Sequence, residues 1–173
     1  LIIGKRYSSA DLAYYNQAGK FPNLIVVNIN SSIDSVLLPA LSNEQDNKER
    51  LRAMTRRAMI SSIYIMAPLM IGLACTAETV VRIVLTEKWL PCVPFLRIHC
   101  MVYLFYPVHT ANLNAVAAQG RSDIFLKLEA AKKIAGVAVL LFTMWISVRA
   151  MAYGMLVTSI LSQVINAWPN KKL

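Results

Sequence analysis

Residues 58–77 read AMISSIYIMAPLMIGLACTA, a run of twenty positions without a charged side chain. A helix that rises 1.5 Å per residue needs about 20 such positions to cross the roughly 30 Å hydrocarbon core of a bilayer. Every backbone N–H and C=O must be bonded inside that core, and a helix satisfies them within the segment. This stretch therefore predicts a membrane-spanning helix.

Other stretches of the chain have the same character. Asp34 is the one charge in 21–41, and 98–120 and 150–170 carry none when the histidines are neutral. The run 134–148 is shorter, but 124–128 extends it. We therefore predict an all-α polytopic membrane helix bundle of about five transmembrane helices, because each run is close to spanning length. The predicted helices, with bends expected at Pro22 and Pro68, cover residues 12–41, 57–86, 94–118, 123–147 and 150–168.

Composition excludes an ordinary soluble domain. Hydrophobic residues make up 57% of the 173 positions and charged residues 16%, against about a quarter charged in typical soluble domains. The net charge of +9 does not indicate nucleic-acid binding, because the basic residues cluster between apolar runs instead of along one face. The three cysteines form no C-x-x-C pair, so they are interpreted as apolar packing residues.

Basic residues also predict an orientation. They gather after 21–41 and 98–120 and in the tail, at alternate ends of the predicted helices. By the positive-inside rule the loop 42–57, the turn 119–123 and the C-terminus are cytoplasmic, and the N-terminus lies outside. No signal peptide is visible, and both ends read as cut from a longer polypeptide.

No catalytic constellation is present in the sequence. It lacks G-x-S-x-G, P-loop and H-E-x-x-H motifs, and most of its nine acidic residues lie in predicted loops. The sequence therefore predicts a protein that is not an enzyme, with no cofactor and no metal.

Polar side chains inside the predicted spans are the candidate functional residues. Such groups are costly in lipid, so they are expected to face the bundle interior or a watery cavity. Lys20, Asn23, Ser31 and Asp34 fall loosely on one face of the first helix. A cation there suits an anionic ligand such as a diphosphate, and a histidine could couple proton movement to conformation. The candidates for substrate or cavity binding are Lys20, Asn28, Asn30, His109 and Asn112.

A purely structural interpretation of these residues stays open. Asn and Ser side chains commonly hold membrane helices together by hydrogen bonds. A partner carboxylate or an interfacial position would equally explain Lys20 and His109.

Several segments together resemble one transporter family. They are YYNQAGKFPNLI at 14–25, VLLPALS at 36–42, TEKWLPCVPFLR at 86–97, GRSD at 120–123 and NAWPNKK at 166–172. The chain resembles the polysaccharide transporters, or Wzx-type oligosaccharide flippases, and within them the lipopolysaccharide and colanic-acid exporters. These belong to the multidrug/oligosaccharidyl-lipid/polysaccharide export superfamily.

The resemblance implies a multi-pass protein of the bacterial inner membrane, with 12 to 14 helices in two lobes. Residues 1–173 would be a fragment of the second lobe, a partial lobe like that of the multidrug exporters. The substrate would be an undecaprenyl-diphosphate-linked oligosaccharide, moved by alternating access with ion coupling. Partners would be that substrate, membrane lipids, the first lobe of the same polypeptide and polysaccharide assembly machinery, and no nucleic acid. The alternatives are a drug or cation exporter of the same superfamily, a membrane enzyme such as an oligosaccharide polymerase, and a structural scaffold.

Overall fold

The computed structural model describes residues 8–44, 47–118 and 122–170, and every secondary-structure element in these ranges is a helix. The predicted all-α class is therefore confirmed. The elements are α2 (Ser9–Asn43), α3 (Lys48–Cys75), α4 (Ala77–Val84), the 3-10 helix η1 (Glu87–Cys92), α5 (Val93–Leu104), α6 (Tyr106–Ala118), α7 (Ser122–Thr143) and α8 (Val148–Asn170).

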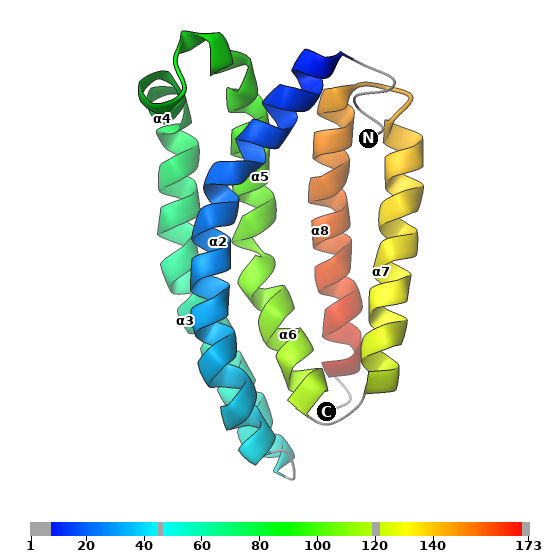
Figure 1. The fold of residues 1–173 in the computed structure, drawn as a ribbon. Helices are drawn as coiled ribbons and strands as arrows, with labels where there is room; N and C mark the ends of the chain where they lie inside the picture. Colours follow the sequence, from blue (N-terminus) through cyan, green and yellow to red (C-terminus); the bar gives the residue numbers. More distant parts are fainter. Residues whose placement is uncertain (1–7, 45–46, 119–121, 171–173) are drawn as a thin grey trace.

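The column formed by α5 and α6 occupies the middle of the bundle. It contacts α2 and α3 on one side and α8 on the other, and α7 packs against α8 (Figure 1). The C-terminal ends of α2, α6 and α8 and the N-terminal ends of α3 and α7 lie towards one end of the bundle, while α4 and η1 lie at the other (Figure 1). The long helices therefore alternate in direction, as in a chain that crosses a layer repeatedly.

Three helical stretches in the described part of the chain are long and apolar enough to cross a membrane: Ser9–Asn43, Glu49–Cys75 and Glu87–Ala117. Large apolar side chains point away from the bundle, with Tyr64 82% and Phe142 75% exposed. Such a surface would be unfavourable in water and is neutral in lipid. The chain is therefore a multi-pass membrane helix bundle. α7 and α8 are of similar length, 22 and 23 residues, but the total of five spans stays a prediction.

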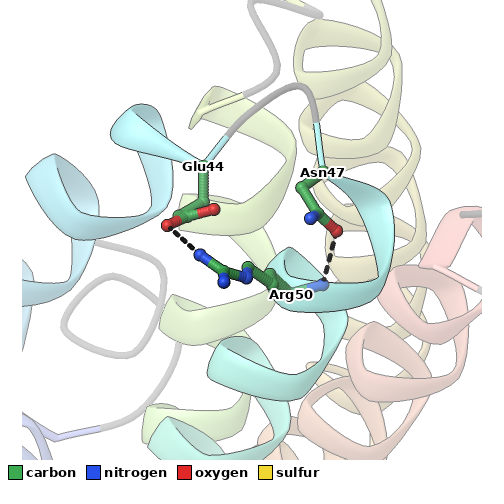
Figure 2. A network of polar contacts seen from close by, with 3 residues as sticks. All are labelled: Glu44, Asn47 and Arg50. Atoms are coloured by element: carbon green, nitrogen blue, oxygen red, sulfur yellow. Dashed lines mark hydrogen bonds and ion pairs between the residues drawn. The ribbon is translucent and has the colours of Figure 1, made fainter.

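The connection between α2 and α3 is shorter than the predicted loop 42–57. Asn47 caps α3 by accepting the Arg50 N–H at 3.1 Å, and the Arg50 guanidinium bonds to Glu44 at 3.1 Å (Figure 2). Leu51, only 1% exposed, packs in one cluster with Leu41. Because the cap and this contact start the helix early, residues from Lys48 onward belong to α3, and the loop prediction was wrong for them.

Two predicted helices are interrupted. The segment 57–86 ends as α3 at Cys75, and α4 follows it directly. The segment 94–118 breaks between α5 and α6, where Pro107 has no N–H to offer the Tyr103 carbonyl. That carbonyl accepts the N–H of Phe105 instead. Pro107 therefore explains the break between α5 and α6, where the sequence had predicted one continuous helix over 94–118.

The last two helices also meet earlier than predicted. α7 ends at Thr143, not at 147, and α8 begins at Val148, not at 150. The Ser147 hydroxyl accepts the N–H of Ala150 at 3.0 Å, which makes Ser147 the cap of α8.

Small residues bring the helices close together. Gly19 of α2 faces the His99 ring, and a Cβ atom there would lie 3.3 Å from it. Gly154 of α8 faces α7, where a Cβ would lie 3.1 Å from both Val139 and Thr143. Such close approach is how membrane helices gain packing energy, since lipid supplies no hydrophobic driving force between them.

Replacing Gly154 by leucine is therefore expected to separate α7 from α8 and to lower the thermal midpoint of the detergent-solubilised protein by several degrees, since overpacking costs about 1–3 kcal/mol. Gly72→Ala is the matched control, because no atom lies within 4 Å of a Cβ at that position. It should be neutral or slightly stabilising. Equal midpoints for the two variants would contradict the packing role of Gly154.

Candidate functional site

The break between α5 and α6 lies near the middle of the bundle. It falls at Phe105, halfway along the residues from Val93 to Ala118. Side chains of α8 bond to two carbonyls at the break. Gln163 donates its amide N–H to the Phe105 carbonyl at 2.8 Å, which also accepts the His109 N–H at 3.4 Å, and the Ser159 hydroxyl donates to the Val102 carbonyl at 3.4 Å. A broken helix at membrane depth is tolerated where polar neighbours compensate it, and such breaks mark binding sites in transporters.

A cavity of about 370 Å³ lies on one side of the break, between α2 and the α5–α6 column. We call it the α2-side cavity. Its wall is polar over much of its area, although it lies at the depth of apolar helices. The lining residues are Asn23, Val26, Val27, Asn30, Ser31, Asp34, Tyr103, Tyr106 and Thr110.

Asp34 and Asn30 are the most informative residues of the α2-side cavity. The Asp34 carboxylate accepts a hydrogen bond of 2.7 Å from the Asn114 amide of α6. None of the ion pairs found among the described residues includes Asp34. One turn away, Asn30 is only 6% exposed, and neither its amide nitrogen nor its oxygen has a hydrogen-bond partner. An unpartnered buried amide costs about 1–3 kcal/mol, so it is typical of a site that a ligand or water completes.

A second cavity, of about 320 Å³, lies between the α5–α6 column and α7 and α8. We call it the α8-side cavity. Lys132 projects into it, with its side chain only 7% exposed and paired to Glu129. The side-chain oxygen of Gln163 is buried there without a partner. The polar lining residues are His99, Tyr103, Tyr106, His109, Lys132, Thr158, Ser159, Ser162 and Gln163.

A column of rings separates the two cavities. Tyr15, His99, Tyr103, Tyr106 and His109 follow one another with centroids 5.0–6.2 Å apart. Tyr103 and Tyr106 line both cavities. These two rings flank Phe105, so a change in the angle between α5 and α6 would move a wall of each cavity at once.

The structure separates the residues proposed from sequence. Asn30 lies in the α2-side cavity and His109 in the α8-side cavity. Lys20 is exposed and lines neither cavity. Asn28 bonds to the Leu24 carbonyl of its own helix at 2.7 Å, and Asn112 is buried on α6.

The predicted polar face of the first helix is brought together in part. Asn23, Ser31 and Asp34 share the α2-side cavity, without Lys20. Asn114, Lys132 and Gln163 were not proposed as site residues. Asn114 is 80 residues from Asp34, so no local pattern could pair them. Lys132 carried one usable signal, a glutamate three residues before it on the same helix.

These features define a class: an α-helical membrane protein with polar cavities at a broken helix. The model of a family described as polysaccharide biosynthesis protein matches residues 1–94. The chain belongs to this family, and its resemblance to the polysaccharide transporters is confirmed.

Three curated relatives share this similarity. The chain is 34% identical over 140 residues to an uncharacterized membrane protein in the cps region of Klebsiella pneumoniae, covering 80% of this chain and 28% of that protein. It is 28% identical over 128 residues to the teichuronic acid biosynthesis protein TuaB of Bacillus subtilis, covering 72% and 26%. It is 27% identical over 132 residues to the lipopolysaccharide biosynthesis protein WzxC of Escherichia coli, covering 76% and 27%.

The chain thus spans about a quarter of the length of these relatives. No solved structure matches it.

Proposed function

We propose that this chain is part of a bacterial inner-membrane transporter that moves a lipid-linked oligosaccharide across the bilayer by alternating access. The observation that supports this most is the pair of polar cavities on either side of the α5–α6 break, in a chain of the polysaccharide biosynthesis family. Two relatives are described as teichuronic acid and lipopolysaccharide biosynthesis proteins, so glycan assembly is the common theme. We propose transport, not catalysis, as its contribution.

In this proposal the two cavities have different roles. Carboxylate and amide groups of Asp34, Asn30 and Asn114 can bond to sugar hydroxyls or hold a coupling cation, and Tyr103 and Tyr106 offer ring faces. Lys132 and His109 supply positive and titratable groups on the other side. Residues 1–173 would belong to a second lobe with its N-terminus outside and C-terminus cytoplasmic, as the basic residues favour. They would not transport without the first lobe.

The proposal is tested in a strain from which the complete gene has been deleted. The expected phenotype is lipid-linked oligosaccharide retained on the cytoplasmic leaflet, with surface glycan lost. Rescue by the full-length wild-type gene restores both. Normal surface glycan in the deletion strain, or a loss of sugar synthesis before the lipid-linked stage, would contradict a translocation role.

Asn30→Leu is expected to separate transport from stability. It removes an unpartnered buried amide, so the variant should be as stable as wild type or more stable by about 1 kcal/mol. It should nevertheless fail to rescue export, because the amide that a ligand completes is gone. Asn28→Leu is the matched control, since its amide bonds within its own helix. Full rescue by Asn30→Leu would exclude the α2-side cavity from transport.

A drug or cation exporter is the second candidate, and Asp34 favours it, since a carboxylate in a cavity suits a cationic substrate. Deletion of the gene would then sensitise the strain to organic cations and leave surface glycan unchanged.

A further inference from the structure

A third hollow lies on the outer surface of the bundle, away from both cavities. It is a groove of about 740 Å³ between α2 and α3, which we call the α2–α3 groove. Its walls are Asn28, Ile29, Ser32, Ile33, Val36, Leu37 and Ala40 of α2 and Met54, Arg57, Ala58, Ser61, Ser62 and Ile65 of α3. Both helices are among the stretches able to span a membrane, and the groove is open at the surface of the described residues.

Most of the uncharged polar side chains of this groove already have hydrogen-bond partners in their own helices. Asn28 donates to the Leu24 carbonyl at 2.7 Å, Ser32 to the Asn28 carbonyl at 2.9 Å and Ser62 to the Ala58 carbonyl. These three side chains are thus satisfied by their own helices, and the fourth uncharged polar side chain in the wall, Ser61, is exposed. What remains for an occupant is aliphatic surface, which suits a hydrocarbon chain.

The groove has the length of one membrane leaflet. From Asn28 to Ala40 it follows thirteen residues of α2, whose first and last Cα atoms are about 18 Å apart along the helix. Half of the hydrocarbon core is about 15 Å. The groove therefore runs from the middle of the bilayer to the level of the headgroups, on the side where α2 connects to α3.

Arg57 stands in the wall near that connection. It is exposed, and it takes part in none of the ion pairs between residues of 8–44, 47–118 and 122–170. Arg52 and Arg56 are exposed on the same turns of α3. An arginine fork matches a phosphate, and each basic residue near an anionic lipid surface contributes about 1 kcal/mol.

We propose that the α2–α3 groove binds one acyl chain of an anionic phospholipid, with Arg57 bonded to its phosphate. A second protein segment on this groove would have to supply an anionic group for Arg57 and an aliphatic strip only one leaflet long. An anionic phospholipid has both features in this order along the membrane normal. This inference does not rest on the proposed function, since the site lies outside the two cavities.

The test uses the full-length protein in nanodiscs of phosphatidylglycerol and phosphatidylcholine, with a trace of phosphatidylglycerol that carries a photoactivatable acyl chain. Mass spectrometry should find the label on the groove face of α3, at Ser61 or Ile65. Arg57→Gln should reduce the preference for phosphatidylglycerol about five-fold. Arg56→Gln is the matched control, because it removes the same charge one residue away from a side chain outside the groove.

A second pair of variants tests the hydrocarbon part. Ala58→Trp fills the groove and should abolish labelling, whereas Ala53→Trp on the outer face of α3 should leave it unchanged.

Three results would overturn the proposal. They are an unlabelled groove in the wild-type protein, equal effects of Arg57→Gln and Arg56→Gln, and labelling that only an isoprenoid-phosphate lipid displaces. Because photolabelling does not depend on translocation, this test decides the lipid proposal even if the proposed transport function is wrong.

Discussion

Asp34→Asn is expected to lower the rate of oligosaccharide export by about tenfold or more, the equivalent of at least about 1.4 kcal/mol in activation free energy. The carboxylate lies in the C-terminal third of a 35-residue helix and lines the α2-side cavity. Its neighbour there is the Asn114 amide, at 2.7 Å. A charge at that depth is stable only with a partner, so in the proposed transport cycle the carboxylate would pass from the Asn114 amide to a cation or a sugar hydroxyl.

The measurement is the rate at which surface glycan reappears when full-length variants are induced in the deletion strain. The matched control is Glu44→Gln, which removes a carboxylate at the end of the same helix, outside the cavity. Asn114→Ala should show a smaller loss, and the double variant should be no worse than Asp34→Asn alone, because both act through one hydrogen bond. Wild-type export by Asp34→Asn would remove Asp34 from the mechanism.

Lys132→Met is expected to have the largest effect on stability. The ammonium is almost fully buried and pairs with Glu129 on the preceding turn of α7. Removing it leaves a carboxylate without its counter-charge in a largely buried site, which costs about 3 kcal/mol. The free energy of unfolding in detergent micelles should fall by about that amount.

Two further variants identify the cause. Lys133→Met removes an exposed neighbouring lysine and should change stability little. In the double variant Lys132→Met with Glu129→Gln no charge is left unpaired, so most of the stability should return. If the double variant is as unstable as Lys132→Met, the loss comes from packing and not from the ion pair.

The membrane class and the positions of the long helices follow from local chemistry. A run such as 58–77 has only one stable form in lipid, because each peptide group must be bonded inside its own segment. The break at Phe105 was also within reach of sequence, since Pro107 cannot continue the hydrogen bonds of α5. The contacts made at the break were not, because the side chains that bond to the Val102 and Phe105 carbonyls, Ser159 and Gln163, are more than 50 residues away.

In the candidate site, too, some features follow from the sequence and others only from the fold. Sequence identified Asn30 and His109 as polar groups at costly positions, but it also proposed Lys20, which the fold leaves exposed outside both cavities. Lys132 has a side chain long enough to reach the membrane surface, but it is held inside by its ion pair with Glu129. A flexible cation can adopt either position. Lys132 is paired with Glu129 of its own helix and is covered by the neighbouring helices that line the α8-side cavity.

The apolar run 58–77 thus determined by itself that this protein lies in a membrane as helices, since the backbone hydrogen bonds that lipid requires form within that one segment. Which of its polar side chains meet in a cavity was decided by the tertiary structure. Asp34 and Asn114 come together from helices far apart in the chain, and a hydrogen bond between them exists only once α2 packs against α6.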